Sequence, residues 1–350
     1  MAFFKELRAI CLIIIGIALA KYLQVELSAP FLTNIVTLSL LIVMFFTTAR
    51  YNRHEPQLKL YTLQTTLIMV SSVVILGFVI SSLFATSLLY SAILGLLASN
   101  VLFGAMSLSL HKENKLLNAL HVESVINSPL TLLAAFVLMD LTVSLELSFG
   151  ILVKLAIFAK DIVIGAGTGL IVGLGMYKFM SRHFTMIKLV LVVASTFFSY
   201  ILSQAMTGNG LIAVLVTAVV FGFFYRKEKE IIFEFFKSLT FIAELIIYCL
   251  LGFVAGLPWD HGFFARTVII FAVLLIVRFA VLSIMQYKRF KVPDIVRFTV
   301  LPPISVVVAA IAILFITSTN MTVMSAGYIL TAIVMYSTLV SAVSRLVTRM

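Results

Sequence analysis

Residues 118–140 carry several polar side chains in a stretch that is otherwise apolar enough to lie within a membrane. Glu123, Asn127 and Thr131 recur every four residues, so a helix places them on one face. An ionisable group at membrane depth costs at least ~2.5 kcal/mol unless it is paired or hydrated, so this face predicts a functional site. The alternative is a polar patch that only joins helices. Such patches are usually built from Ser, Thr or Asn, however, and not from a carboxylate.

A second charge lies inside an apolar stretch, because Arg278 falls near the middle of residues 263–286. It needs a counter-charge there, and Glu123 is the most deeply placed carboxylate in the sequence. We predict that the two side chains form an ion pair. Glu244, within the apolar residues 234–257, is the alternative partner. A buried pair is also compatible with a purely structural role in fixing the helix arrangement.

The composition is that of an integral membrane protein. Of the 350 residues, 62% are hydrophobic and 11% are charged, which excludes a soluble domain with a charged surface. The formal net charge is +11, but the basic residues stand in short clusters between apolar runs, so we expect no nucleic-acid partner. Cys11 and Cys249 lie within apolar segments, which excludes a disulfide framework and a zinc site. With no HExxH motif, paired membrane aspartates or Ser/His arrangement, we expect neither a cofactor nor an enzyme.

Apolar stretches of about 20 residues, the length needed to span a bilayer, follow one another along the whole chain. They fall at residues 9–27, 29–49, 60–84, 86–110, 118–140, 159–178, 186–206, 209–225, 234–257, 263–286, 296–317 and 324–344. Residues 144–158 are apolar but interrupted by charge, and we expect them to lie at the membrane surface. The prediction is an all-α polytopic membrane protein with about twelve transmembrane helices, in a single domain over residues 1–350.

The basic residues predict how the chain is oriented. Alternate loops and ends hold twenty of the twenty-five lysines and arginines, whereas the opposite set holds only Lys21 and Arg266. Because basic loops stay in the cytoplasm, we expect a multi-pass protein of the cell membrane with both termini cytoplasmic. The first apolar segment has no small-residue cleavage pattern before Lys21, so we expect it to be retained as a helix.

Two of the expected helices contain a break. Pro302 and Pro303 stand inside residues 296–317, where they remove two backbone donors, and a packed kink is the alternative to a true interruption. Ser99 and Asn100 mark a weaker break in residues 86–110. Interrupted helices at corresponding positions of two halves are typical of secondary transporters with inverted repeats. The approximate repeats are residues 1–140 and 186–345.

Several segments, in the expected order, resemble the sodium/proton antiporter family, in the cation:proton antiporter branch that includes the NhaP-type exchangers. Glu123, Ser124, Asn127 and Pro129 resemble its ESxxND(P/A)TA segment. Residues 199–222 look like its AEALGxSGxLAVVxAGLxxG stretch, and Arg278 falls where the family has an arginine. The resemblance implies inverted repeats with crossed, partly unwound fourth and eleventh helices, a homodimer, and exchange of a small cation for protons. It also implies that Asn127 is the family's Asn and that Glu123 and Arg278 are its structural ion pair.

The chain departs from this family at the positions that carry the chemistry. Ser128 stands where the family has its ion-binding Asp, Ser99 and Asn100 replace the first two residues of a TDP motif, and residues 300–305 lack a GLRG segment. A serine hydroxyl does not ionise near neutral pH, but it can still ligate a cation beside the Asn127 amide.

We therefore expect a cation site at Asn127, Ser128, Ser99 and Asn100, near the break at Pro302 and Pro303. Proton coupling would rest on Glu123, Glu244 or His121, or be lost. The expected function is antiport of a monovalent cation (Na+, Li+ or K+) against protons by alternating access. The alternatives are an uncoupled or different-solute transporter of the same fold, and a membrane scaffold or sensor that transports nothing.

Overall fold

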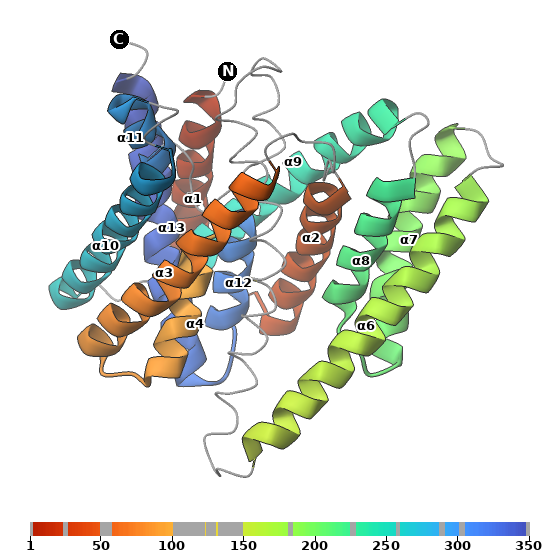
Figure 1. Cartoon of the computed structure of the whole chain (residues 1–350), viewed down its shortest axis with the longest axis horizontal. Coiled ribbons are helices and arrows are strands. Elements are labelled where there is room, and N and C mark those ends of the chain that lie inside the picture. Colours follow the sequence, from red (N-terminus) through yellow and green to blue (C-terminus); the bar gives the residue numbers. More distant parts are fainter. Residues whose placement is uncertain are drawn as a thin grey trace. The chain divides into compact units, whose positions relative to one another are not determined.

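A computed structural model gives the structure of the chain (Figure 1). The residues it describes are 3–23, 27–49, 58–100, 123, 131, 150–180, 185–224, 229–256, 260–286, 291–300 and 305–347.

The described residues are almost entirely α-helical and include no strand. Their helices are α1 (Phe3–Leu23), α2 (Ala29–Ala49), α3 (Leu58–Phe84), α4 (Leu88–Ala98), α6 (Gly150–Met180), α7 (Thr185–Ala205), α8 (Gly210–Phe224), α9 (Lys229–Val254), α10 (His261–Gln286), α11 (Val292–Val300), α12 (Val306–Ile316) and α13 (Met321–Val347). Seven of the described helices are long and apolar enough to cross a membrane, and α4, α8 and α12 are shorter apolar helices. The expected all-α polytopic membrane fold is confirmed.

Helix α6 differs from the sequence-based expectation. It runs without interruption over 31 residues from Gly150, so residues 150–158 belong to this helix and do not form a separate surface segment. At 1.5 Å per residue the helix is about 46 Å long, which exceeds the thickness of a hydrocarbon core. The charged residues in this stretch suggested a boundary, but no Pro or Gly lies between Gly150 and Gly165 to end the helix.

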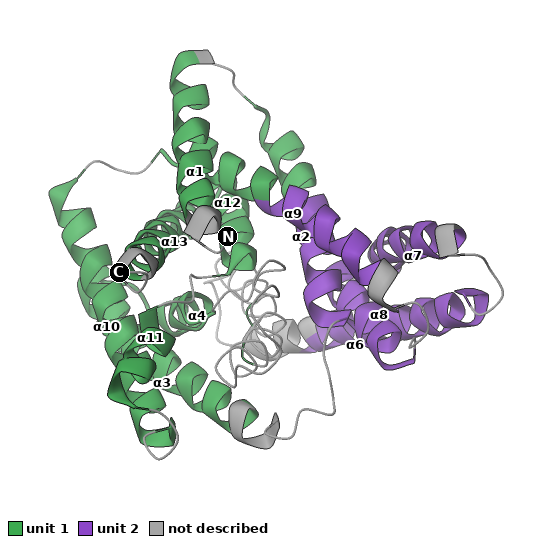
Figure 2. Ribbon diagram, turned by 90° about the horizontal axis from the view of Figure 1, so that it is seen from above, with its two compact units in different colours: residues 1–36, 56–142, 245–350 green, residues 37–55, 143–244 purple. Residues whose placement is uncertain are grey.

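The chain divides into two compact units (Figure 2). Unit 1 comprises residues 1–36, 56–142 and 245–350, and unit 2 comprises residues 37–55 and 143–244. Helices α2 and α9 each contribute one part to either unit.

In unit 2, α6 packs closely against α8 along a row of glycines spaced four residues apart. A Cβ atom added to Gly169 would collide with the Ala213 carbonyl oxygen, and one added to Gly173 would lie 2.8 Å from Val220 Cβ. Because the two helices lie so close, the Thr217 hydroxyl on α8 donates a hydrogen bond to Gly169 O on α6 at 3.0 Å. The glycines at positions 165, 169 and 173 therefore permit close packing of α6 against α8.

In unit 1, two helical hairpins hold half-length helices in the interior. Helix α4 returns along α3 with Gly95 against the Ser72 carbonyl oxygen, where a Cβ would lie 2.8 Å away. Helices α12 and α13 form the second hairpin, with Gly327 against Ile316. At 11 residues each, α4 and α12 are only about 16 Å long and cannot span a bilayer alone. Both hairpins therefore bring a helix end into the interior.

Candidate functional site

The end of α4 meets the break between α11 and α12 inside unit 1. Helix α4 ends at Ala98 with Ser99 as its C-cap, within the stretch expected to continue to residue 110. The expected helix of residues 296–317 is also interrupted, because α11 ends at Val300 and α12 begins after Ser305. Ser305 N donates a hydrogen bond to Asn100 O at 3.1 Å, so the backbones of the two breaks are in direct contact. Pro302 and Pro303 lie outside the described residues.

Sequence-based reasoning did not identify Ser305, although it caps α12. Its hydroxyl accepts a hydrogen bond from Val307 N at 3.2 Å, which satisfies one of the free donors at the helix start. A serine shortly after a double proline is a recognisable helix-start signal, so the sequence did contain this information.

At the break, Ser99 and Asn100 are buried. The Ser99 hydroxyl donates to Leu96 O at 2.8 Å. Within the described part of the chain, neither the oxygen nor the nitrogen of the Asn100 amide has a hydrogen-bond partner. Leaving such groups unpaired in the interior is costly, so an unpaired buried amide is exceptional. Its oxygen can ligate a cation, and its nitrogen can donate a hydrogen bond.

The structure brings Glu123 and Arg278 together. Arg278 Nη2 donates to Glu123 Oε2 at 2.8 Å, and the two side chains are 5% and 0% exposed, respectively. The contact is a single bond and not the two parallel bonds that an arginine can make to a carboxylate. Glu123 Oε1 and Arg278 Nε have no hydrogen-bond partner among the described residues. Glu123 therefore keeps one buried oxygen that can accept a proton or a cation.

Arg278 lies beside the ends of both interrupted helices. It lines a cavity together with Ala98 and Ser99 at the end of α4 and Thr299 and Val300 at the end of α11. The carbonyl groups at a helix C-terminus carry partial negative charge, which a nearby cation stabilises. The arginine is thus placed to balance the two helix ends as well as the Glu123 carboxylate.

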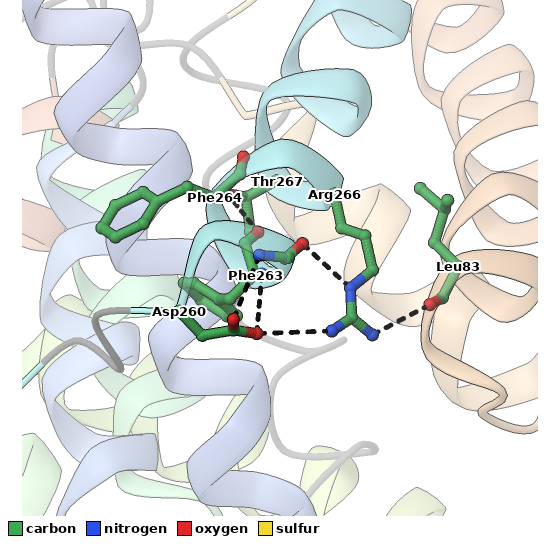
Figure 3. Close-up of polar contacts among 7 residues, drawn as sticks. Leu83, Asp260, Phe263, Phe264, Arg266 and Thr267 are labelled. Atoms are coloured by element: carbon green, nitrogen blue, oxygen red, sulfur yellow. Dashed lines mark hydrogen bonds and ion pairs between the residues drawn. The ribbon is translucent and has the colours of Figure 1, made fainter.

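Helix α10, which carries Arg278, is fixed at its start by a cap. Asp260 accepts hydrogen bonds from the backbone of Gly262 and Phe263, each at 3.2 Å (Figure 3). Arg266 donates to Gly262 O at 3.0 Å and to Leu83 O, at the end of α3, at 3.3 Å. This network joins the start of α10 to the end of α3 within unit 1.

The other predicted site residues are Glu244, His121, Asn127 and Ser128. Glu244 is buried on α9, is assigned to unit 2 and takes part in an interaction of its own. His121, Asn127 and Ser128 lie outside the described residues. Where the chain is described, no group of three or more His, Cys, Asp or Glu residues could hold a metal ion.

Comparison with known proteins agrees with the architecture. No family model matches the sequence. Over 161 residues, 44% of this chain, the sequence is 26% identical to the low-affinity Na+/H+ antiporter NhaS1 of Synechocystis. The match spans only 30% of the length of that relative.

Two solved structures of the sodium proton antiporter MjNhaP1 from Methanocaldococcus jannaschii superpose with a TM-score of 0.73 each and are 16% identical in sequence. The superpositions cover 95% of this chain, and 92% and 88% of the two MjNhaP1 chains. At this identity the likeness concerns the fold alone. The chain is thus similar in sequence to part of one sodium/proton antiporter and similar in fold to another.

Proposed function

We propose that this protein is a secondary transporter that exchanges a small monovalent cation, Na+, Li+ or K+, for protons by alternating access. The observation that carries the proposal is the meeting of two interrupted helices beside a buried carboxylate with one unpaired oxygen. A carboxylate that binds either a proton or a cation, but not both, couples the two fluxes. The relatives named as sodium/proton antiporters support the same activity.

The cation site in this proposal combines neutral oxygens with one carboxylate. Asn127, Ser128, Ser99 and Asn100 supply amide, hydroxyl and backbone oxygens near the break at Pro302 and Pro303. Uncharged oxygens of this kind ligate alkali cations by replacing part of their hydration shell.

Glu123 takes the role of the missing aspartate, because its Oε1 has no hydrogen-bond partner among the described residues. Arg278 holds the other oxygen and keeps the carboxylate in place. His121 and Glu244 are the remaining candidates for proton coupling, and the measurements below include a variant that tests Glu123 alone.

The setting of this transporter is the cell membrane, in a homodimer with both termini cytoplasmic. The distribution of lysines and arginines supports the orientation. The large apolar side chains exposed along the described helices, such as Phe78, Val163 and Ile284, support contact with lipid. The approximate inverted repeats, residues 1–140 and 186–345, supply the two halves that alternate.

The test is proton flux in sealed vesicles containing the purified full-length protein, challenged in turn with sodium, lithium and potassium. We expect at least one cation to dissipate a preformed pH gradient, and Asn127→Ala and Glu123→Gln to abolish this flux. Glu234→Gln is the matched control, because Glu234 is an exposed carboxylate paired with Lys237 at 3.3 Å. It should leave the flux unchanged.

Other results would replace the proposal. If labelled sodium crosses while no cation moves protons, the protein is an uncoupled transporter, which the serine at position 128 would explain. If nothing crosses, the scaffold or sensor interpretation takes its place.

Ser128→Asp sharpens the test of the site's location. Restoring a carboxylate next to Asn127 should create or strengthen proton exchange driven by sodium or lithium, because a second group then binds the proton or the cation in competition. An unchanged rate at every pH would show that residue 128 is not at the ion site.

A further inference from the structure

Beside Arg278 lies a cavity that shares Ser99 with the proposed cation site. Its volume, counted as the space open to the centre of a water molecule, is about 20 Å³. This exceeds the 10 to 15 Å³, roughly, that one water molecule requires. The cavity is bordered by α3, α4, α10, α11 and α13, all within unit 1.

Among the described residues, the polar lining of the cavity is formed by Ser99, Arg278, Thr299 and Ser337, and Ile68 and Phe271 belong to its apolar lining. A water molecule is stable in the interior only where it finds two to four polar partners. A purely apolar cavity of this size would remain dry. The lining therefore suits water and not a hydrocarbon group.

Three of these side chains together offer one hydrogen-bond donor and two acceptors, which suits one water molecule. Ser99 and Thr299 each use their only hydroxyl proton within the helix, donating to Leu96 O at 2.8 Å and to Ile295 O at 3.0 Å. Each hydroxyl oxygen still has acceptor capacity. Arg278 Nε, by contrast, is a buried donor without an acceptor among the described residues.

We infer that the cavity is a binding site for a single water molecule that joins Arg278 to the ends of both interrupted helices. The water accepts a hydrogen bond from Arg278 Nε and donates its two protons to the hydroxyls of Ser99, at the end of α4, and Thr299, near the end of α11. This gives it three partners, the usual number for a buried water.

The water fixes the orientation of the guanidinium group. With Nε held toward the cavity, Arg278 presents Nη2 to Glu123 and makes one bond, not two, which leaves Glu123 Oε1 unpaired. Ser99 and Thr299 are then positioning residues that act on the ion pair through the water. The inference does not depend on transport activity.

Radiolytic hydroxyl-radical footprinting of the full-length protein in lipid nanodiscs tests the site, because a bound water generates radicals next to the side chains that surround it. We expect Phe271, which lines the cavity, to be oxidised several-fold faster than Phe315, a fully buried residue that does not line it. Phe271 is 8% exposed, so the effect of the variants decides whether the oxidation comes from the cavity.

Thr299→Val and Ser99→Ala should each lower the oxidation rate of Phe271 several-fold, since each removes one acceptor of the water. Thr331→Val is the matched control, because Thr331 is buried, donates to the carbonyl oxygen four residues earlier as Thr299 does, and does not line the cavity. It should leave the rate unchanged. Circular dichroism of each variant verifies the helix content.

Two results would overturn the inference. If Phe271 in the unsubstituted protein is oxidised as slowly as Phe315, the cavity is dry. If Phe271 is oxidised rapidly but neither Thr299→Val nor Ser99→Ala slows it, the radicals arise elsewhere and these hydroxyls hold no water. The first comparison needs no variant, so a substitution that prevents folding cannot obscure it.

Discussion

Helix α10 carries two arginines whose surroundings differ sharply. Arg266, near the start of the helix, has a side chain that is 40% exposed, and its Nη2 lies 3.9 Å from Asp260 Oδ2 (Figure 3). Arg278 is almost completely buried and bonds Glu123 at 2.8 Å. Water and salt screen the first charge, whereas the second depends on its partner. The same residue type on the same helix is therefore peripheral in one place and critical in the other.

Of the substitutions that test this difference between the two arginines, Arg278→Met is expected to have the largest effect on stability. The substitution leaves the Glu123 carboxylate buried without its counter-charge, and breaking a buried pair in this way costs about 3 to 5 kcal/mol. The free energy of unfolding, measured by titrating protein in mixed micelles with sodium dodecyl sulfate, should fall by this amount.

The matched control is the double variant Glu123→Gln with Arg278→Met, which removes both charges. It should recover most of the lost stability, because no uncompensated charge remains in the interior. A double variant as unstable as Arg278→Met alone would show that the arginine acts through packing and not through its charge.

The contrast between the two arginines also marks what the sequence could predict. A positive charge in the middle of an apolar stretch demands a partner, and the depth of Glu123 identified it. The helix positions followed from apolar length in the same way, because most expected stretches match the described helices within a few residues. Apolar length and buried charge are both visible in a single sequence.

Contacts between distant segments could not be predicted. Nothing in the sequence pairs Arg266 with Leu83 O or Ser305 N with Asn100 O, because backbone carbonyls are the same at every position. Thr299 and Ser337 were missed for a related reason. A hydroxyl that bonds its own helix looks the same in sequence whether or not a cavity lies beside it.

A smaller effect is expected at the start of α10 from Asp260→Ala. Asp260 caps the helix by accepting from Gly262 N and Phe263 N, and loss of such a cap costs about 1 kcal/mol. Asp260→Asn keeps an accepting oxygen and should retain most of this stability. If Asn is as destabilising as Ala in the same micelle titration, the charge and not the cap is what matters at this end of α10.

The smallest effect on stability is expected from Arg266→Gln, which tests the partly exposed arginine of the pair. The substitution removes the hydrogen bond to Leu83 O, the long contact with Asp260 and the stacking of the guanidinium 5.0 Å above the Phe84 ring. Because water screens these contacts, their loss should cost less than about 1 kcal/mol.

The cost of Arg266→Gln should also decrease as salt is added, whereas the cost of Arg278→Met should not. Lys237→Gln, which removes another partly exposed ion pair, should show the same salt dependence. A cost for Arg266→Gln that equals that of Arg278→Met would mean that the tie between α10 and α3 holds the unit together as firmly as the buried pair, and exposure would no longer separate the two arginines.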